Sequence, residues 1–251
     1  VAELVAELIG RGAGPEYVGI LYRANCQSCA LEQAFLRREI PYHVLGVRFF
    51  DRHEVKNTLA FIRAALNRES WTDIKRIINV PPRGIGKTTL LRLIEGRHSE
   101  LTPAFQKRVD AFFDLLDRIK ERAVAEPPRA VIQFVLAETG IQKALEDDGD
   151  EGLERIENIL ELASLASKYD ALPPPEGIEK LLEDAALATD QDSLETNENA
   201  VKLMTVHAAK GLEFPYVFIT GCEEDLFPHR KLSEDRLSGE EAEEERRLFY
   251  V

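Results

Sequence analysis

The sequence is poor in cysteine. Three cysteines in 251 residues cannot build the disulfide framework of a small secreted domain. Cys26 and Cys29 form a CxxC pair, but only Cys222 remains as a further thiol, whereas a structural zinc site needs four ligands. We therefore expect no metal site, and a reducing, cytoplasmic compartment fits the chain best.

Long apolar runs and a basic leader are also absent. No run approaches the roughly 20 apolar residues that span a bilayer. The first ten residues, VAELVAELIG, contain acids where a secretory signal would carry basic residues. We expect neither a membrane span nor a signal peptide. Hydrophobic residues still make up 44% of the chain, which is enough for a folded core.

An excess of positive charge is the third absence. The net charge is −13, which disfavours nucleic acid as a partner because phosphate-binding proteins usually carry a basic excess. Binding is local, however, and the two signs are segregated. The acids concentrate in Glu146–Glu154, Glu176–Asp192 and Glu240–Glu245. Basic residues gather elsewhere, as Arg37, Arg38, Arg48 and Arg52, and as Lys75, Arg76, Arg83 and Lys87. The composition therefore leaves a nucleic-acid partner possible.

The two ends of the chain carry strand patterns. Near the start, a helix over Val1–Gly10 precedes an apolar strand at Tyr17–Tyr22, a helix at Ser28–Arg38 and a strand at Ile40–Leu45. Near the end, strands are predicted at Val201–Val206 and Tyr216–Thr220, with a helical-looking turn at Ala208–Leu212 between them and an acidic helix over Gly239–Val251. Neither end has enough strands for its own sheet.

The middle of the chain has helical periodicity almost throughout. The predicted helices are Glu54–Asn67, Trp71–Asn79, Thr88–Arg97, Pro103–Ala125, Arg129–Thr139, Ile141–Asp147, Gly152–Asp170 and Gly177–Ala188. We interpret the chain as an α/β fold with one parallel sheet built from both ends and interrupted by an all-α insertion. Such an insertion costs little folding free energy, because the entropy lost on closing a loop grows slowly with loop length.

One segment imitates a phosphate-binding loop. Gly84-Ile85-Gly86-Lys87-Thr88 resembles the end of GxxxxGK[ST], but Pro81 stands where the first glycine belongs, and a helix rather than a strand precedes it. Proline also lacks the N–H that a phosphate cradle uses. We reject a nucleotide site there.

Two other interpretations of this segment remain open. It is either an ordinary corner between two helices or a hairpin, plugged by Ile85, that presents N–H groups and a helix N-terminus to one DNA phosphate. In the second case Arg83, Lys87 and Thr88 would add contacts.

Two longer stretches carry a resemblance. Residues within Ile20–Arg52 include YRANCQSC, and Val201–Val251 contains TVHAAKGLEFPYVFITGCEEDLFPHR followed by EEERRLFYV. Together with PPRGIG at Pro81–Gly86, these resemble the UvrD, PcrA and Rep family of superfamily 1 DNA helicases. The resemblance implies the second RecA-like motor domain, over 1–45 and 194–251. It places the family's helical insertion subdomain over 46–193, with hinges near Gly46 and Leu194.

The resemblance also implies roles for particular residues. Glu213, next to Gly211, matches the carboxylate that accepts a hydrogen bond from the nucleotide ribose. The positions that match contacts to single-stranded DNA are Arg23, Asn25, Thr205, His207 and His229. The positions that would hold duplex DNA are Gly84, Gly86 and Thr88. Taken alone, Arg23 and Asn25 suit a buried salt bridge and a helix cap equally well, and a lone histidine such as His229 is more often structural.

Departures and absences limit what the resemblance implies. Cys29 stands where the family usually has arginine, and Val47 where it commonly has glycine. The phosphate-binding loop and the acids that hold Mg²⁺ belong to the family's first motor domain, and the chain stops before its arginine finger. We therefore expect a fragment of an ATP-dependent 3′-to-5′ helicase that is inactive alone. ATP and Mg²⁺ would act only in the longer protein.

The expected partners are single-stranded and duplex DNA, the first motor domain, and repair or transcription proteins. A non-catalytic alternative is a protein-docking platform, because the acidic surface of the insertion suits protein contact better than DNA contact. A helicase–nuclease of the AddA or RecB kind is disfavoured, because those proteins carry much longer insertions.

Overall fold

The computed structural model describes residues 1–23, 27–192, 199–223, 243 and 246–247. Asn25, Cys26 and His229 lie outside the described residues, as does most of the predicted helix over Gly239–Val251. Two compact units form: one comprises Val1–Arg52 with Asp190–Val251, and the other comprises His53–Thr189. The boundaries between the two units thus lie a few residues from the expected positions 46 and 193.

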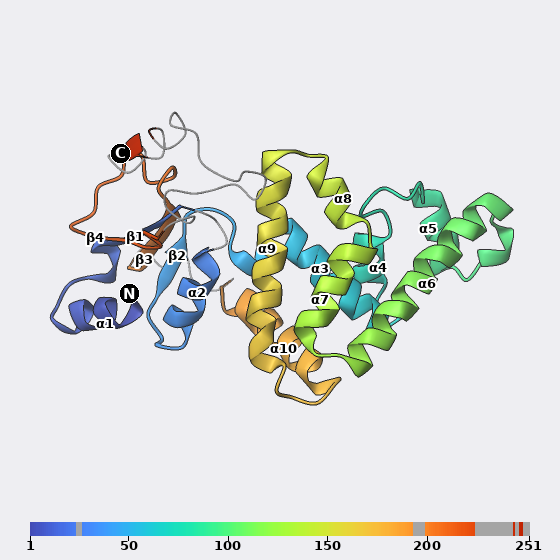
Figure 1. Ribbon diagram of the computed structural model, residues 1–251, viewed down its shortest axis with the longest axis horizontal. Helices are drawn as coiled ribbons and strands as arrows, with labels where there is room; N and C mark the ends of the chain where they lie inside the picture. The colour runs from blue at the N-terminus through green and yellow to red at the C-terminus, as the bar shows by residue number, and fades with distance from the viewer. Residues whose placement is uncertain (24–26, 193–198, 224–242, 244–245, 248–251) are drawn as a thin grey trace. The chain divides into compact units, whose positions relative to one another are not determined.

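The first unit contains a four-stranded parallel sheet (Figure 1). Its elements are α1 (Ala2–Gly10), β1 (Val18–Tyr22), α2 (Ser28–Leu36), β2 (Tyr42–Val44), β3 (Val201–Thr205) and β4 (Tyr216–Ile219), with short 3-10 turns at Pro15–Tyr17 and Phe49–Asp51. The strand order is β2-β3-β1-β4. Strands from the two ends of the chain therefore join in one sheet, as the sequence predicted, and within it they alternate. The segment Ala208–Leu212 forms turns.

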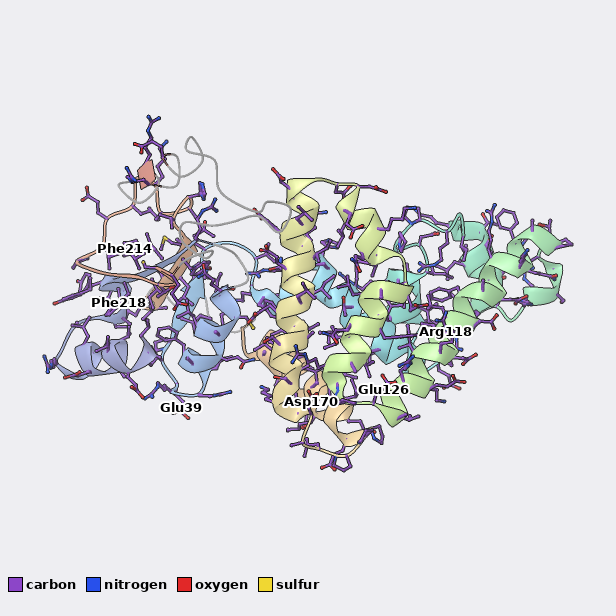
Figure 2. The ribbon with its side chains drawn as sticks, in the orientation of Figure 1. Glu39, Arg118, Glu126, Asp170, Phe214 and Phe218 are labelled. Carbon is purple, nitrogen blue, oxygen red and sulfur yellow. The ribbon has the colours of Figure 1, made fainter. Side chains whose placement is uncertain are left out.

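The core of this unit lies on both faces of β1. All five residues of β1 are buried, which fits a central parallel strand covered on each side. Phe35 of α2 and Val5 of α1 pack with the residues of one face, and Met204 belongs to the cluster on the other. Gly19 makes room for an aromatic ring, since a Cβ there would lie 2.7 Å from Cδ2 of Phe214. Figure 2 labels Phe214 and Phe218, the second of which is a residue of β4.

A buried polar cluster lies beside this core, at the start of α2. Arg52 Nη2 donates to Ser28 Oγ at 2.8 Å, and both side chains are buried. Burial raises the pKa of Glu32, against the opposing effects of a Ser28 hydrogen bond and the Arg52 charge. Burial and the nearby Glu32 raise the pKa of Tyr22 to about 12. One carboxylate oxygen of Glu32 and the hydroxyl of Tyr42 are buried and have no hydrogen-bond partner among the described residues.

The second unit is helical throughout its described length. Its helices are α3 (His53–Leu66), α4 (Trp71–Ile77), α5 (Lys87–Ile94), α6 (Pro103–Ala125), α7 (Pro128–Glu138), α8 (Ile141–Glu146), α9 (Asp150–Ala166) and α10 (Glu176–Asp192), with 3-10 turns at His98–Glu100 and Ser167–Tyr169. The centre is α3, which contacts α4, α6, α7 and α9. Its segment Thr58–Ile62 is uncharged and buried. Among the described residues, no helix is long and apolar enough to cross a membrane.

Candidate nucleic-acid interface

The carboxyl ends of β1 and β3 bring three of the predicted contact residues to one edge of the sheet. Tyr22 at the end of β1 is aligned with Thr205 at the end of β3. The chain then continues to Arg23 on one strand and to His207 on the other, and Val206 N–H donates to Tyr22 O at 2.9 Å. In open parallel sheets, ligands bind at this edge.

The turn after β3 controls how Thr205 and His207 are presented. Thr205 Oγ1 accepts a hydrogen bond from Ala208 N–H at 3.2 Å, and Thr205 O accepts one from Ala209 N–H at 3.1 Å. A hydroxyl that accepts still has a proton to donate. The His207 side chain is exposed. The turn therefore fixes a hydroxyl at the end of the strand and presents an exposed imidazole two residues later.

Gln27 is a residue of this edge that the motif-based prediction missed. Its Oε1 accepts from the backbone N–H of Arg23 at 2.9 Å. Its Nε2 lies against Gly221, where a Cβ would be only 1.9 Å away, and Gly221 has a φ of +69°. Gln27 therefore links the segments that follow β1 and β4. Its position one residue before a helix was the only signal in the sequence.

The GLEF segment places a carboxylate beside open space. Glu213 is exposed, while the next residue, Phe214, is packed over Gly19 of β1. Gly211 has a φ of +85°, a left-handed conformation that favours glycine, and a Cβ there would meet no atom within 4 Å. The partly buried ring thus anchors a segment whose carboxylate and glycine remain accessible to a ligand.

In the second unit, the segment between α4 and α5 is a tight hairpin organised by Asn79. Asn79 Oδ1 accepts from the backbone N–H groups of Arg83 and Ile85, each at 3.1 Å, and Asn79 Nδ2 donates to Ile85 O. Ile85 is 1% exposed, so it plugs the hairpin as the sequence predicted. Sequence reasoning missed Asn79, because a lone asparagine at a helix end has many ordinary roles.

The residues on either side of buried Ile85 face solvent. Gly84, Gly86, Lys87 and Thr88 are all exposed. Within the described part of the chain, the N–H groups of Gly84 and Gly86 make no hydrogen bond. The first N–H groups of any helix lack partners within that helix, and α5 begins at Lys87. Asn79 therefore binds one set of N–H groups and leaves the other set available.

Arg83, which would add a DNA contact in the hairpin interpretation, has structural partners within the helical unit. Burial lowers its pKa to about 10, and its guanidinium lies over the rings of Phe61 and Phe112. Its nitrogens donate to the carbonyl groups of Val80 at 2.7 Å, Thr139 at 2.9 Å, and Ile77 and Pro81 at 3.2 Å. A guanidinium suits this task because it has several donors in a rigid plane. Arg83 pins the hairpin to the helical core.

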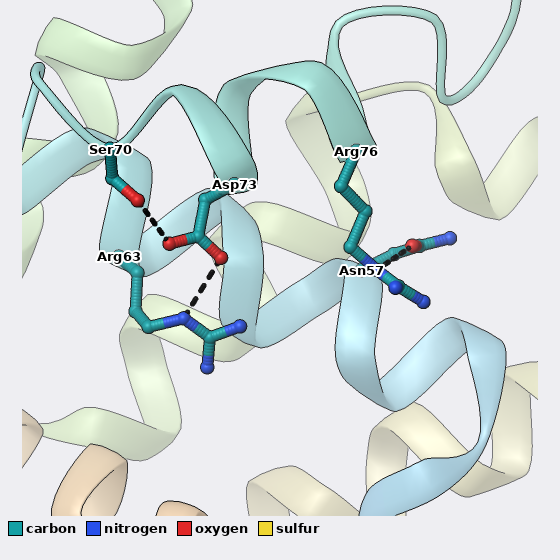
Figure 3. Close-up of polar contacts among 5 residues, drawn as sticks. All are labelled: Asn57, Arg63, Ser70, Asp73 and Arg76. Carbon is teal, nitrogen blue, oxygen red and sulfur yellow. Dashed lines mark hydrogen bonds and ion pairs between the residues drawn. The ribbon is translucent and has the colours of Figure 1, made fainter.

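The helix that leads into the hairpin is itself fastened to α3 (Figure 3). Arg63 Nε donates to Asp73 Oδ1 at 2.9 Å, and Ser70 Oγ donates to Asp73 Oδ2 at 2.6 Å. Arg76 Nε donates to Asn57 Oδ1 at 2.9 Å. Of the basic cluster noted in the sequence, Arg76 and Arg83 therefore have structural partners, and Lys87 stays exposed.

The two units together define a class of protein. A parallel sheet with polar side chains at its carboxyl edge, interrupted by a helical unit and lacking a phosphate-binding loop of its own, is the second domain of a RecA-like motor. The chain belongs to the UvrD-like helicase C-terminal domain family, whose model matches residues 1–251. The resemblance seen in the sequence motifs is thereby confirmed.

Characterised proteins with similar sequences agree with this assignment. The chain is 35% identical to DNA helicase II of Escherichia coli strain K12 over 257 residues, which cover 92% of the chain and 35% of the relative. It is 36% identical to ATP-dependent DNA helicase PcrA of Staphylococcus epidermidis, over 95% of the chain and 35% of the relative. The chain thus spans about a third of the length of these relatives.

Proposed function

We propose that this chain supplies the second motor domain and the helical insertion of an ATP-dependent 3′-to-5′ DNA helicase. The observation that carries the proposal is the meeting of Arg23, Thr205 and His207 at one edge of a sheet built from both ends of the chain. A guanidinium, a hydroxyl and an imidazole can all donate to phosphate or sugar oxygens without reading base sequence. This edge of the sheet would therefore contact the backbone of single-stranded DNA. Asn25 and His229 are proposed to extend the contact surface.

The second part of the proposal concerns the nucleotide. The open space at Gly211 and the exposed Glu213 carboxylate fit the ribose of ATP, because a carboxylate can accept from a sugar hydroxyl. The 251 residues contain no GxxxxGK[ST] motif, so the groups that hold the triphosphate and Mg²⁺ belong to another domain. Bound ATP would supply the free energy of hydrolysis for translocation. The chain by itself is proposed to have no ATPase activity.

The third part assigns duplex DNA to the hairpin. The exposed Gly84, Gly86 and Thr88 lie where N–H groups and the positive end of α5 are available to a phosphate. Such a contact does not depend on base sequence. The insertion would therefore grip duplex ahead of the junction with the single strand.

DNA titration of the purified chain tests the proposal. A hairpin duplex with a 3′ single-stranded tail is expected to bind, and more weakly as salt rises, because binding releases counterions. Gly86→Ala is expected to weaken duplex binding, and His207→Ala to weaken the added affinity conferred by the tail. Gly10→Ala is the matched control, because a Cβ at either glycine meets no atom within 4 Å. A folded chain that binds no DNA would contradict the proposal and favour a protein-docking platform.

A further inference from the structure

An arginine outside every motif lies against the hairpin. Arg108 projects from α6, and its Nη1 donates to Gly84 O at 3.2 Å. Its guanidinium also lies over the ring of Phe105, 5.5 Å from the ring centroid. The residue is nevertheless exposed. Two contacts therefore hold a solvent-facing guanidinium at Gly84, in the same hairpin as the exposed Gly86 and Thr88.

Within the part of the chain that the structure describes, Arg108 lacks the acidic partner that the two arginines in the second half of α6 have. Helix positions three and four residues away are the ones that pair, and around Arg108 they are Ala104, Phe105, Ala111 and Phe112. In contrast, Arg118 pairs with Glu138 and Arg122 with Glu126. Among the described residues, no ion pair is formed by Arg108. In a chain of net charge −13, Arg108 is therefore a local positive charge without an acidic partner among the described residues.

We infer that Arg108 is a DNA phosphate contact, so that the hairpin and α6 grip the duplex backbone together. This inference rests on the proposed duplex role of the hairpin. A guanidinium has five N–H donors, and the bond to Gly84 O uses one, which leaves others for phosphate oxygens. Ordering the side chain before DNA arrives also lowers the entropy lost on binding. Arg108 would thus supply the arginine contact that one interpretation of the sequence gave to Arg83.

The conformation of Gly84 is tied to this residue. A Cβ at Gly84 would lie 2.6 Å from Arg108 Nη1. Since that atom is the end of a flexible side chain, Gly84→Ala is expected to displace Arg108 as well as strain a backbone whose φ is +68°. The effects of Gly84→Ala and Arg108→Gln on duplex affinity should therefore be non-additive, as expected for residues in contact.

The salt dependence of duplex binding distinguishes a phosphate contact from a structural one. In Arg108→Gln the charge is gone while a polar side chain remains, so the slope of log Kobs against log salt is expected to fall in magnitude by about 0.9. We expect a roughly fivefold loss of affinity at low salt, equal for different duplex sequences. In Arg108→Lys the charge remains, so the slope should stay near the wild-type value.

The matched control is Arg122→Gln on the same helix, which changes the net charge equally but removes an arginine paired with Glu126. It should alter neither affinity nor slope, and circular dichroism must show every variant folded. A wild-type slope in Arg108→Gln, with duplex binding still lost in Gly86→Ala, would overturn this inference and leave the proposed function standing. A wild-type chain that does not bind duplex would overturn both.

Discussion

At the scale of single residues, the role of Asn79 in the hairpin can be tested directly by substitution. Asn79→Ala leaves the N–H of buried Ile85 without its acceptor, and an unmade hydrogen bond of this kind costs about 1–3 kcal/mol. We expect a loss of this size in the free energy of unfolding, measured by urea denaturation followed at 222 nm. Duplex binding should weaken as well, because the available N–H groups lose their arrangement.

Two comparisons sharpen that test. Asn79→Asp keeps the acceptor oxygen and loses only the donor to Ile85 O, so it should cost less than alanine. Asn67→Ala removes an exposed side chain whose Oδ1 accepts one backbone hydrogen bond, from Glu69 N–H at 3.0 Å. That control is expected to change stability by no more than about 0.5 kcal/mol. Equal losses in Asn79→Ala and Asn67→Ala would contradict the role assigned to Asn79.

The raised pKa of buried Glu32 leads us to expect that the stability of the first unit depends on pH. Burial raises its pKa above the ordinary value of 4.5, so the folded state binds a proton more tightly than the unfolded state does. The corresponding stability is present below pH 4.5 and is lost as pH rises through the raised pKa. Arg48 and Arg52 oppose the shift, and the pKa values of the neighbouring Tyr22 and Tyr42 are themselves raised by burial.

Glu32→Gln removes this titration while keeping the shape of the side chain. Relative to wild type, the variant should gain stability as pH is raised from 4 to 7, because only the wild type must bury a charge over that range. Thermal unfolding at a series of pH values measures the difference. A constant difference between the two proteins across the series would rule out the raised pKa.

At the scale of elements, the two glycines of the hairpin should behave differently. Gly84 has a φ of +68°, where an L-residue costs about 1–2 kcal/mol. Gly86 has a φ of −74° and open space at its Cβ position, so Gly86→Ala should cost only the lost helix-cap preference, about 0.5–1 kcal/mol. Its methyl group would instead obstruct a phosphate approaching α5.

Unfolding and duplex titration of both variants separate the two effects. Gly84→Ala should be the more destabilised protein, and Gly86→Ala should lose more affinity than its stability loss explains. If affinity follows stability in both variants, the hairpin is only a structural corner, which was the other interpretation open from the sequence.

The elements themselves were predictable because their patterns are strong. Period-3.6 spacing and the proline and glycine breaks located α3 to α10 to within a few residues, and Pro103–Ala125 was predicted to the residue. The partners of Arg83 were not predictable from the sequence. A basic residue near two glycines can either extend into solvent or donate hydrogen bonds to several backbone carbonyl groups. The carbonyl of Thr139 and the ring of Phe112 reach it only through tertiary packing.

The candidate site was predictable in part for a similar reason. Motifs located Thr205, His207 and Glu213, but Gln27 and Arg108 contact residues far along the chain. Nothing in their local sequence shows those contacts. Residues within one continuous segment could therefore be chosen from the sequence, and residues that act across segments needed coordinates.

At the scale of the whole molecule, the order of the strands determines which pieces can fold. β2 pairs with β3, and β1 pairs with β3 and β4. Every strand partner of residues 1–52 therefore comes from beyond residue 200. The helical unit His53–Thr189 draws its core from its own helices around α3. The sheet depends on both ends of the chain, while the insertion does not.

Separate expression of the pieces tests this dependence. Residues 53–189 should show helical circular dichroism and one cooperative urea transition, as expected for a compact domain with its own core. Residues 1–52 should remain largely unfolded, because parallel strands without neighbours leave their backbone groups unpaired. The 53–189 piece should also keep the salt-dependent duplex affinity of the full chain, since the hairpin and Arg108 both lie within it. A 53–189 piece that folds but binds no duplex, while the full chain binds it, would move the duplex contact from the hairpin to the sheet.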